Sequence, residues 1–200
     1  MRVTTHAKFA LKLAAIVVSI LPTTVLGASP SEDQGARPEL AVTYAYIRSN
    51  APPAGSTSIN LNGGSATFAW PLTSHDLSLV GDFMAAHSGG ITASGYSLTL
   101  ASYTAGVRYS PSFSQWAHPY GQALFGMAHA SGSLVQAQTI SVPNAGATFA
   151  LNLGGGLTIR THSRFSIRPI EVDYLLTTFK NGTNNHQNNV RIGSGLVFVF

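Results

Sequence analysis

The sequence predicts an all-β fold, an eight-stranded antiparallel up-and-down transmembrane β-barrel. Three observations support this prediction. Only 9% of the residues are charged, against about 25% in an average soluble domain. Large apolar side chains alternate with small or polar ones along most of the chain. The chain has no cysteine, so an exported fold of this size cannot be closed by disulfides and needs backbone pairing instead.

Residues 1–28 have the pattern of a secretory signal peptide. Arg2, Lys8 and Lys12 precede an apolar run at residues 13–21, and small residues follow at 27–29. The run is well short of the roughly 20 residues that a membrane-spanning helix needs, which argues against an N-terminal anchor. We expect cleavage after Gly27 or Ala28, a short N-terminal segment at 29–37, and one outer-membrane barrel domain over 38–200.

The charge of the exported chain is close to zero. Removal of residues 1–28 takes away three of the eleven Lys and Arg residues and none of the seven acids, leaving eight against seven and a net charge of +1. The basic isoelectric point therefore comes largely from the leader, and no nucleic-acid partner is expected.

Alternation with period two marks the strands. It is plainest over residues 147–159, where Phe149, Leu151 and Leu153 share one parity while Ala150 and Asn152 share the other. After residue 28 no run of 18 apolar residues remains, so helical spans are not expected. The predicted strands are 39–48, 64–71, 77–87, 98–109, 119–130, 147–159, 165–178 and 189–200. Most have the length of a tilted membrane-crossing strand.

The connectors alternate in length. Long ones are predicted at 49–63, 88–97, 131–146 and 179–188, and short ones at 72–76, 110–118 and 160–164. Transmembrane barrels have long loops outside the cell and short turns in the periplasm. Both termini are therefore expected on the periplasmic side.

A soluble β-sandwich is the alternative fold, since it also offers short alternating strands. The composition of the second face of each strand argues against it. This face carries Gly, Ala, Ser, Thr and Asn with almost no Lys, the residue that commonly protects exposed sheet edges in soluble proteins from pairing with other chains. In a membrane barrel the large apolar residues face lipid and the small or polar ones fill the lumen. Aromatic residues near strand ends are expected to form interfacial girdles: Tyr44, Tyr46, Trp70, Tyr103, Tyr109, Trp116, Tyr120, Tyr174, Phe198 and Phe200.

The final segment, VRIGSGLVFVF, and the segment IEVDYLLT at 170–177 resemble the small eight-stranded outer-membrane proteins of the OmpA transmembrane-domain, OmpX and opacity-protein type. The resemblance covers about 38–200. It implies that Phe200, with Phe198 on the same face, is the terminal signal read by the outer-membrane assembly machinery. Nothing follows Phe200, so the peptidoglycan-binding domain of the larger members, and a wall-tethering role, are not expected.

Five charged residues share the inward parity of their strands: Asp82, Arg108, Glu171, Asp173 and Arg191. Unpaired charges in a narrow lumen are costly, so we expect one ion-pair and hydrogen-bond network. Independent solvated charges in a wet pore are the alternative. Arg168 does not fit the parity of Glu171, and Pro169 beside it has no N–H, so a β-bulge is expected there.

These features predict an integral protein of a Gram-negative type outer membrane with a structural or surface-interaction role through its loops. A narrow low-conductance channel is the alternative, because eight strands leave an interior that side chains just fill. A lipid-modifying enzyme is a lesser alternative, for which His87, His129, His162, His186, Ser131 and Ser163 are the candidate residues. We expect no enzyme activity, cofactor or metal. The expected partners are outer-membrane lipid, lipopolysaccharide, the assembly machinery and periplasmic chaperones.

Overall fold

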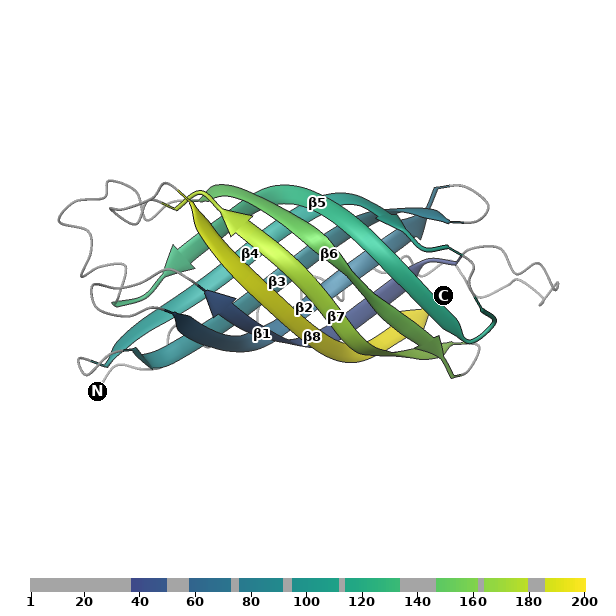
Figure 1. Ribbon diagram of the computed structural model, residues 1–200, viewed down its shortest axis with the longest axis horizontal. Coiled ribbons are helices and arrows are strands. Elements are labelled where there is room, and N and C mark those ends of the chain that lie inside the picture. The colour runs from purple at the N-terminus through teal and green to yellow at the C-terminus, as the bar shows by residue number, and fades with distance from the viewer. Residues whose placement is uncertain are drawn as a thin grey trace. The chain divides into compact units, whose positions relative to one another are not determined.

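The computed structural model contains one barrel within the unit formed by Gly35–Phe200 (Figure 1). The structure describes residues 37–49, 58–72, 76–91, 95–111, 114–133, 147–161, 164–179 and 186–200. The predicted signal peptide and most of the predicted N-terminal segment lie outside these residues. No helix among the described residues has the length and apolar character needed to cross a bilayer.

Eight strands form the barrel, each pairing antiparallel with its neighbours in sequence, and β1 also pairs with β8 (Figure 1). The strands are β1 Glu39–Ser49, β2 Ile59–Pro71, β3 Leu77–Ile91, β4 Tyr96–Tyr109, β5 Ala117–Ser131, β6 Thr148–Arg160, β7 Phe165–Thr177 and β8 Gln187–Val199. Because the barrel is closed, every strand is paired on both sides. This pairing stabilises the fold in place of the disulfides that hold other small exported folds together. The predicted fold class is confirmed.

The two barrel ends differ in their connectors. At one end, which we call the loop end, the strands are joined by connectors 50–58, 92–95, 132–147 and 178–186. At the other, the turn end, they are joined by connectors 72–76, 110–116 and 161–164, and the first strand begins at Glu39 and the last ends at Val199. We use these two names below. The turn end is further closed by a backbone bond from the Phe200 N–H to the Pro38 carbonyl at 3.0 Å.

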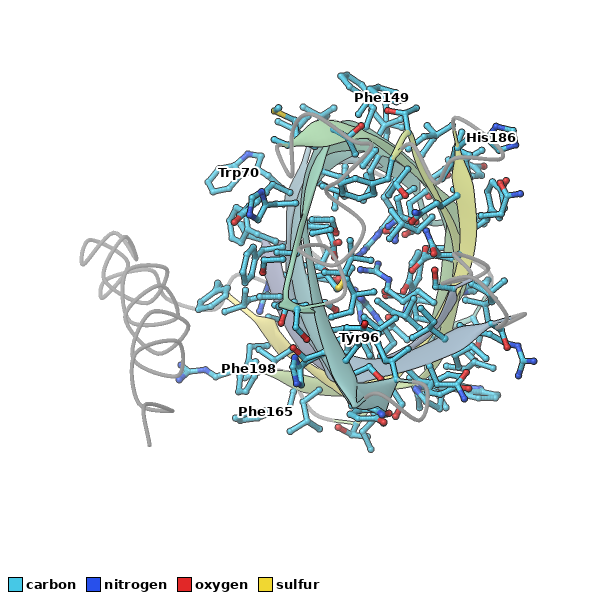
Figure 2. All side chains as sticks on the ribbon, turned by 90° about the vertical axis from the view of Figure 1, so that its left-hand side faces the viewer. Trp70, Tyr96, Phe149, Phe165, His186 and Phe198 are labelled. Carbon is cyan, nitrogen blue, oxygen red and sulfur yellow. The ribbon has the colours of Figure 1, made fainter. Side chains whose placement is uncertain are left out.

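Side chains alternate between the lumen and the exterior along each strand, as the sequence predicts. In β8, Asn189, Arg191 and Gly193 are buried while Val190 and Ile192 are exposed. The exterior is apolar, and Figure 2 shows Trp70 and Phe149 pointing away from the barrel wall. A wall of this kind suits a hydrocarbon environment, because every strand hydrogen bond is made within the barrel.

Three of the predicted boundaries need correction. Strand β2 begins at Ile59 instead of 64, and β3 and β4 reach Ile91 and Tyr96, so the predicted long connector at 88–97 shrinks to residues 92–95. The sequence suggests a loop here because of Gly89 and Gly90. These glycines instead continue the strand through a register irregularity between Ser88 and Ile91, with Gly90 at a positive φ of 72°.

The predicted bulge in β7 is present. Arg168 pairs with Gly195 and Glu171 with Gly193, so β7 has one residue more than β8 in this interval. Pro169 and Ile170 both face outward, and the parity of the strand changes there. Arg168 and Glu171 therefore both point into the lumen although they are three positions apart.

Candidate functional site

The polar half of the lumen is built around the Arg191 guanidinium. Its Nη1 lies 2.8 Å from an oxygen of Asp82, and its Nη2 lies 2.9 Å from Glu171 and 2.7 Å from Asp173. Its Nε donates a further bond of 2.9 Å to Asp173. All four side chains are at most 4% exposed. One guanidinium on β8 thus links carboxylates from β3 and β7.

Arg168 adds a second cation that the set of predicted residues omits. Its Nη1 donates to Glu171 at 2.7 Å, and both side chains are buried. Its guanidinium carbon lies 4.7 Å from the centre of the Tyr120 ring, which supplies a cation–π contact for the face of the group. The bulge in β7 makes this pair possible, because it brings both side chains to the same face.

Arg108 contacts no carboxylate among the described residues. It donates through Nε and Nη2 to the Gln122 side-chain oxygen at 3.2 and 2.8 Å, and the Gln122 amide donates to Asp173 at 3.1 Å. The neutral Gln122 therefore connects Arg108 to the ion pairs. Arg108 also lies 4.2 Å from the centre of the Tyr120 ring, whose hydroxyl donates to Glu171 at 2.5 Å.

We call the six buried charged side chains the charge cluster: Asp82, Arg108, Arg168, Glu171, Asp173 and Arg191. They are the buried charged residues within the described part of the chain, and they comprise three acids and three arginines. A buried set of charges is tolerable when it is balanced and its members are hydrogen-bonded to one another. The cluster is balanced in charge, and each of its three acids bonds to an arginine. Arg108 bonds to the neutral Gln122, and the Nε and Nη2 of Arg168 have no hydrogen-bond partner among the described residues. The burial of the cluster disfavours the alternative of independent solvated charges.

Two glycines of β6 provide room for this cluster. A Cβ on Gly154 would lie 2.1 Å from an oxygen of Asp173, and a Cβ on Gly156 would lie 2.7 Å from the Tyr120 hydroxyl. Both glycines face the lumen. Gly154 pairs across the ladder with Asp173, and Gly156 pairs with Tyr120. Any larger residue at 154 would have to displace Asp173 or the backbone of β7.

The half of the lumen next to the loop end contains a large apolar layer beside the buried Ser49, Thr177 and Asn189, which corrects the expectation that small and polar side chains fill the lumen throughout. The apolar layer consists of Ala45, Ile47, Ile59, Leu61, Met84, Ala86, Ile91, Leu98, Leu100, Ala128, Ala150 and Leu175. These residues lie in the strand halves next to the loop end, and Tyr96, seen within the ring of strands in Figure 2, packs against them. A narrow barrel closes its lumen by packing, so large apolar side chains are favoured inside as well as outside.

Of the five predicted lumen residues, four are in direct contact and Arg108 is joined to them through Gln122. Sequence reasoning missed Arg168, Gln122 and Tyr120. Tyr120 was predicted in the interfacial girdle, but it is only 7% exposed and faces the lumen. Tyr120 has the same parity along β5 as Gln122 and Leu124, and this shared parity is the sequence signal that could have placed it in the lumen.

The other predicted girdle residues lie partly at the barrel ends and partly at strand centres, where Tyr44 and Tyr103 are exposed in the middle of β1 and β4. Trp70, Tyr109 and Trp116 are more than half exposed near the turn end. Phe198 packs edge-on against Phe165 with ring centres 5.2 Å apart, and Phe200 is 48% exposed. The two residues of the predicted assembly signal thus lie on the outer surface where the barrel ends.

The candidate catalytic residues do not form a triad in the described part of the chain. His87 lies on β3 with its Nδ1 2.9 Å from the Thr99 hydroxyl, and His129 and Ser131 lie two positions apart on β5. His186 immediately precedes β8, and His162 and Ser163 lie outside the described residues. Within the described residues, no three His, Cys, Asp or Glu side chains are grouped to hold a metal.

Comparison with solved structures places this architecture among known proteins. The barrel is similar to neisserial surface protein A, with 12% identity over 83% of this chain and 99% of that one and a TM-score of 0.61. It is similar to the outer membrane protein OprG of Pseudomonas aeruginosa, with 10% identity over 83% and 97% and a TM-score of 0.55. The chain has the fold of the small outer-membrane β-barrels.

A third barrel of this fold is the attachment invasion locus protein Ail of Yersinia pestis, with 18% identity over 82% of this chain and 100% of that one and a TM-score of 0.50. No protein-family model and no curated protein sequence matches the chain. The resemblance stated from the terminal segments is confirmed at the level of the fold.

Proposed function

We propose that this small outer-membrane barrel is a closed integral membrane protein whose role is structural or is exerted through surface contacts at the loop end. In this proposal the chain is exported by its signal peptide to a Gram-negative type outer membrane. Periplasmic chaperones and the assembly machinery deliver it, and lipid and lipopolysaccharide surround it. The apolar exterior and the fold shared with outer-membrane barrels support this location.

The observation that carries the proposal is that two sets of buried side chains fill the lumen. The apolar layer lies in the strand halves next to the loop end, and the charge cluster adjoins it, with Arg191 directly across the ladder from Ile47. A solute crossing the barrel would have to displace both packed apolar side chains and paired charges. This arrangement favours a closed barrel over the alternative of a narrow channel.

The distribution of acids disfavours a hydrolytic enzyme at the loop end. The seven acidic residues of the sequence are Glu32, Asp33, Glu39, Asp76, Asp82, Glu171 and Asp173. None belongs to a loop-end connector, and the three in the lumen are engaged in the charge cluster. Among the described residues, His129 and Ser131 therefore have no carboxylate at the loop end to complete a triad of the usual kind.

Surface labelling on intact cells tests the location and the orientation together. Epitope tags inserted at residue 53, 142 or 184 should be accessible to antibody, because these positions lie in loop-end connectors. Tags at residue 112 or 162 should be labelled only after the outer membrane is permeabilised. The reverse pattern would contradict the orientation, and absence of the protein from the outer-membrane fraction would contradict the location.

The terminal residue provides a test of assembly. Deleting Phe200, or replacing it with Asp, should leave the chain in the periplasm, where it is degraded, because the change removes the predicted terminal signal. Replacing the similarly exposed Phe165 with Leu is the control and should leave assembly intact. Folding is read from the shift in electrophoretic mobility between unheated and boiled samples. Normal amounts of folded barrel from the Phe200→Asp variant would refute the assignment.

A further inference from the structure

The lumen near the turn end contains buried hydrogen-bond donors that have no partner in the protein. Among the described residues, the Nε and Nη2 of Arg168 and the Ser166 hydroxyl are shielded from solvent and bond to no other group. Arg168 is 0% exposed and Ser166 is 1% exposed. An unpaired buried donor is costly, so three of them in one place indicate that another molecule accepts their bonds.

The two unpaired nitrogens of Arg168 lie on one edge of its guanidinium. Arg168 uses the remaining nitrogen, Nη1, to bond Glu171 at 2.7 Å. The Nε and Nη2 edge is the one through which a guanidinium binds an anion with two parallel bonds. Arg191 shows this use within the same lumen, because its Nε and Nη2 bond Asp173 at 2.9 and 2.7 Å. Arg168 offers the same edge without a carboxylate on it.

Ser166 lies beside this edge. It precedes Arg168 by two positions on β7, and both side chains face the lumen where β7 leaves the turn end. Ser166 pairs across the ladder with Arg160 on β6, and on the other side of β6 His118 pairs with Thr158. The His118 Nε2 is also buried without a partner, and Arg160 is close enough for its charge to act on His118. The unpaired groups therefore belong to neighbouring strands at one level of the barrel.

Positive charge predominates around the free edge. Arg168 and Arg108 both contact the Tyr120 ring, and they are close enough for their charges to repel each other. The acid bonded to Arg168 is Glu171, whose other oxygen bonds to Arg191. A water molecule could accept hydrogen bonds here but would leave this repulsion in place. An anion accepts the bonds and also offsets the charge.

The unpaired buried atoms elsewhere in the described part of the lumen are of a different kind. They are the side-chain carbonyl oxygens of Asn152 and Asn189 and the hydroxyls of Thr104 and Thr177. Carbonyl oxygens cannot donate to an anion, and the two hydroxyls lie on different strands, β4 and β7, without an unpaired cation beside them. The donors suited to an anion are thus concentrated at Arg168 and Ser166.

We propose that the free edge of Arg168 and the Ser166 hydroxyl bind a small monovalent anion, such as chloride or formate, inside the turn end of the lumen. The anion accepts bonds from Nε, Nη2 and the hydroxyl, and it reduces the repulsion between Arg108 and Arg168. This site goes beyond the proposed function, because it lies within the barrel wall and does not depend on what the loops contact. The bound anion adds to the closure of the lumen.

The experiment measures urea unfolding of the full-length exported chain, folded in nonionic detergent. Sodium gluconate, whose anion is too large for the site, is replaced stepwise by sodium chloride or sodium formate at constant ionic strength. The wild-type midpoint should rise and then saturate, because an anion that binds only the folded state stabilises it. A midpoint that does not depend on which anion is present would overturn the site.

Ser166→Ala should raise the half-saturating concentration of chloride about tenfold, because it removes one hydrogen bond to a charged group. Thr104→Val is the matched control, since it removes another buried, unpaired hydroxyl from a position across the ladder from Asp82. It should leave the half-saturating concentration unchanged. Arg168→Lys, which keeps the charge but loses the paired edge, should weaken binding at least as much as Ser166→Ala. Equal effects of Ser166→Ala and Thr104→Val would contradict the site.

Glu39 is the competing acceptor, because its charge acts on both Arg108 and His118. Glu39→Gln should lower the half-saturating concentration of chloride, since it removes a negative charge near the bound anion. A chloride effect seen only in Glu39→Gln would show that Glu39 itself occupies the edge and would overturn the proposal. Crystals grown in sodium bromide give a direct test, in which an anomalous peak should lie within hydrogen-bond distance of Arg168 and Ser166. Bromide peaks confined to the outer surface would refute the site.

Discussion

Replacing Arg191 with Ala should destabilise the barrel by about 3 to 5 kcal/mol, the cost typical of removing one partner from a buried ion pair. The reason is that Arg191 contacts Asp82, Glu171 and Asp173, so the change leaves an excess of buried negative charge. Glu171 keeps its bond to Arg168, and Asp173 keeps its bond to Gln122. Asp82 keeps the Thr67 hydroxyl but loses its cation.

Urea unfolding of the refolded barrel in detergent or lipid measures this loss. Adding Asp82→Asn to Arg191→Ala should recover part of the stability, because it neutralises the carboxylate left without a cation. The recovery should be incomplete, since two other acids also bonded to Arg191. Arg164→Ala, an exposed site, is the control. Equal stability of wild type and Arg191→Ala would show that the charge cluster does not hold the lumen together.

Replacing Gly154 with Ala should disrupt barrel closure. Its Cβ would lie 2.1 Å from an oxygen of Asp173 and 2.4 Å from the Val172 carbonyl, so relief requires movement of the β7 backbone. Overpacking of this kind costs about 1 to 3 kcal/mol or more, and here it also disturbs the bonds that Asp173 makes to Arg191 and Gln122.

Gly81→Ala is the matched control, because a Cβ there meets nothing within 4 Å and the side chain points outward. The yield of heat-modifiable barrel and its urea midpoint should fall for Gly154→Ala and stay near wild type for Gly81→Ala. Equal behaviour of the two variants would contradict the tight packing of β6 against Asp173.

The alternation of side chains predicted most of the fold because the exterior of the barrel obeys it closely. It placed Arg191, Glu171 and Asp173 in the lumen, because their neighbours of opposite parity are large and apolar and face the exterior of the barrel. It also predicted the bulge, because Pro169 lacks the N–H that a regular strand needs.

The same pattern failed where the lumen is apolar. In β2, Ile59 and Leu61 face inward while Asn60 and Asn62 face outward, the reverse of the usual arrangement in a membrane barrel. The prediction of a long connector over 49–63 rested on its content of Gly, Ser and Asn, and it missed this inverted alternation. Gln122 was missed for a different reason: its role depends on which strands meet across the lumen, which parity along one strand does not reveal. Arg168 was left out of the predicted network although the predicted bulge brings it to the same face of β7 as its partner Glu171.

Single-channel recording in planar lipid bilayers tests most directly whether the lumen is closed. The wild type should remain closed or show only rare, small openings, because the apolar layer and the charge cluster both fill the lumen. Arg191→Ala should open more often or more widely, since it removes the central cation of the cluster. Steady conductance by the wild type that Arg191→Ala leaves unchanged would contradict the closed barrel and favour a wet, weakly selective pore.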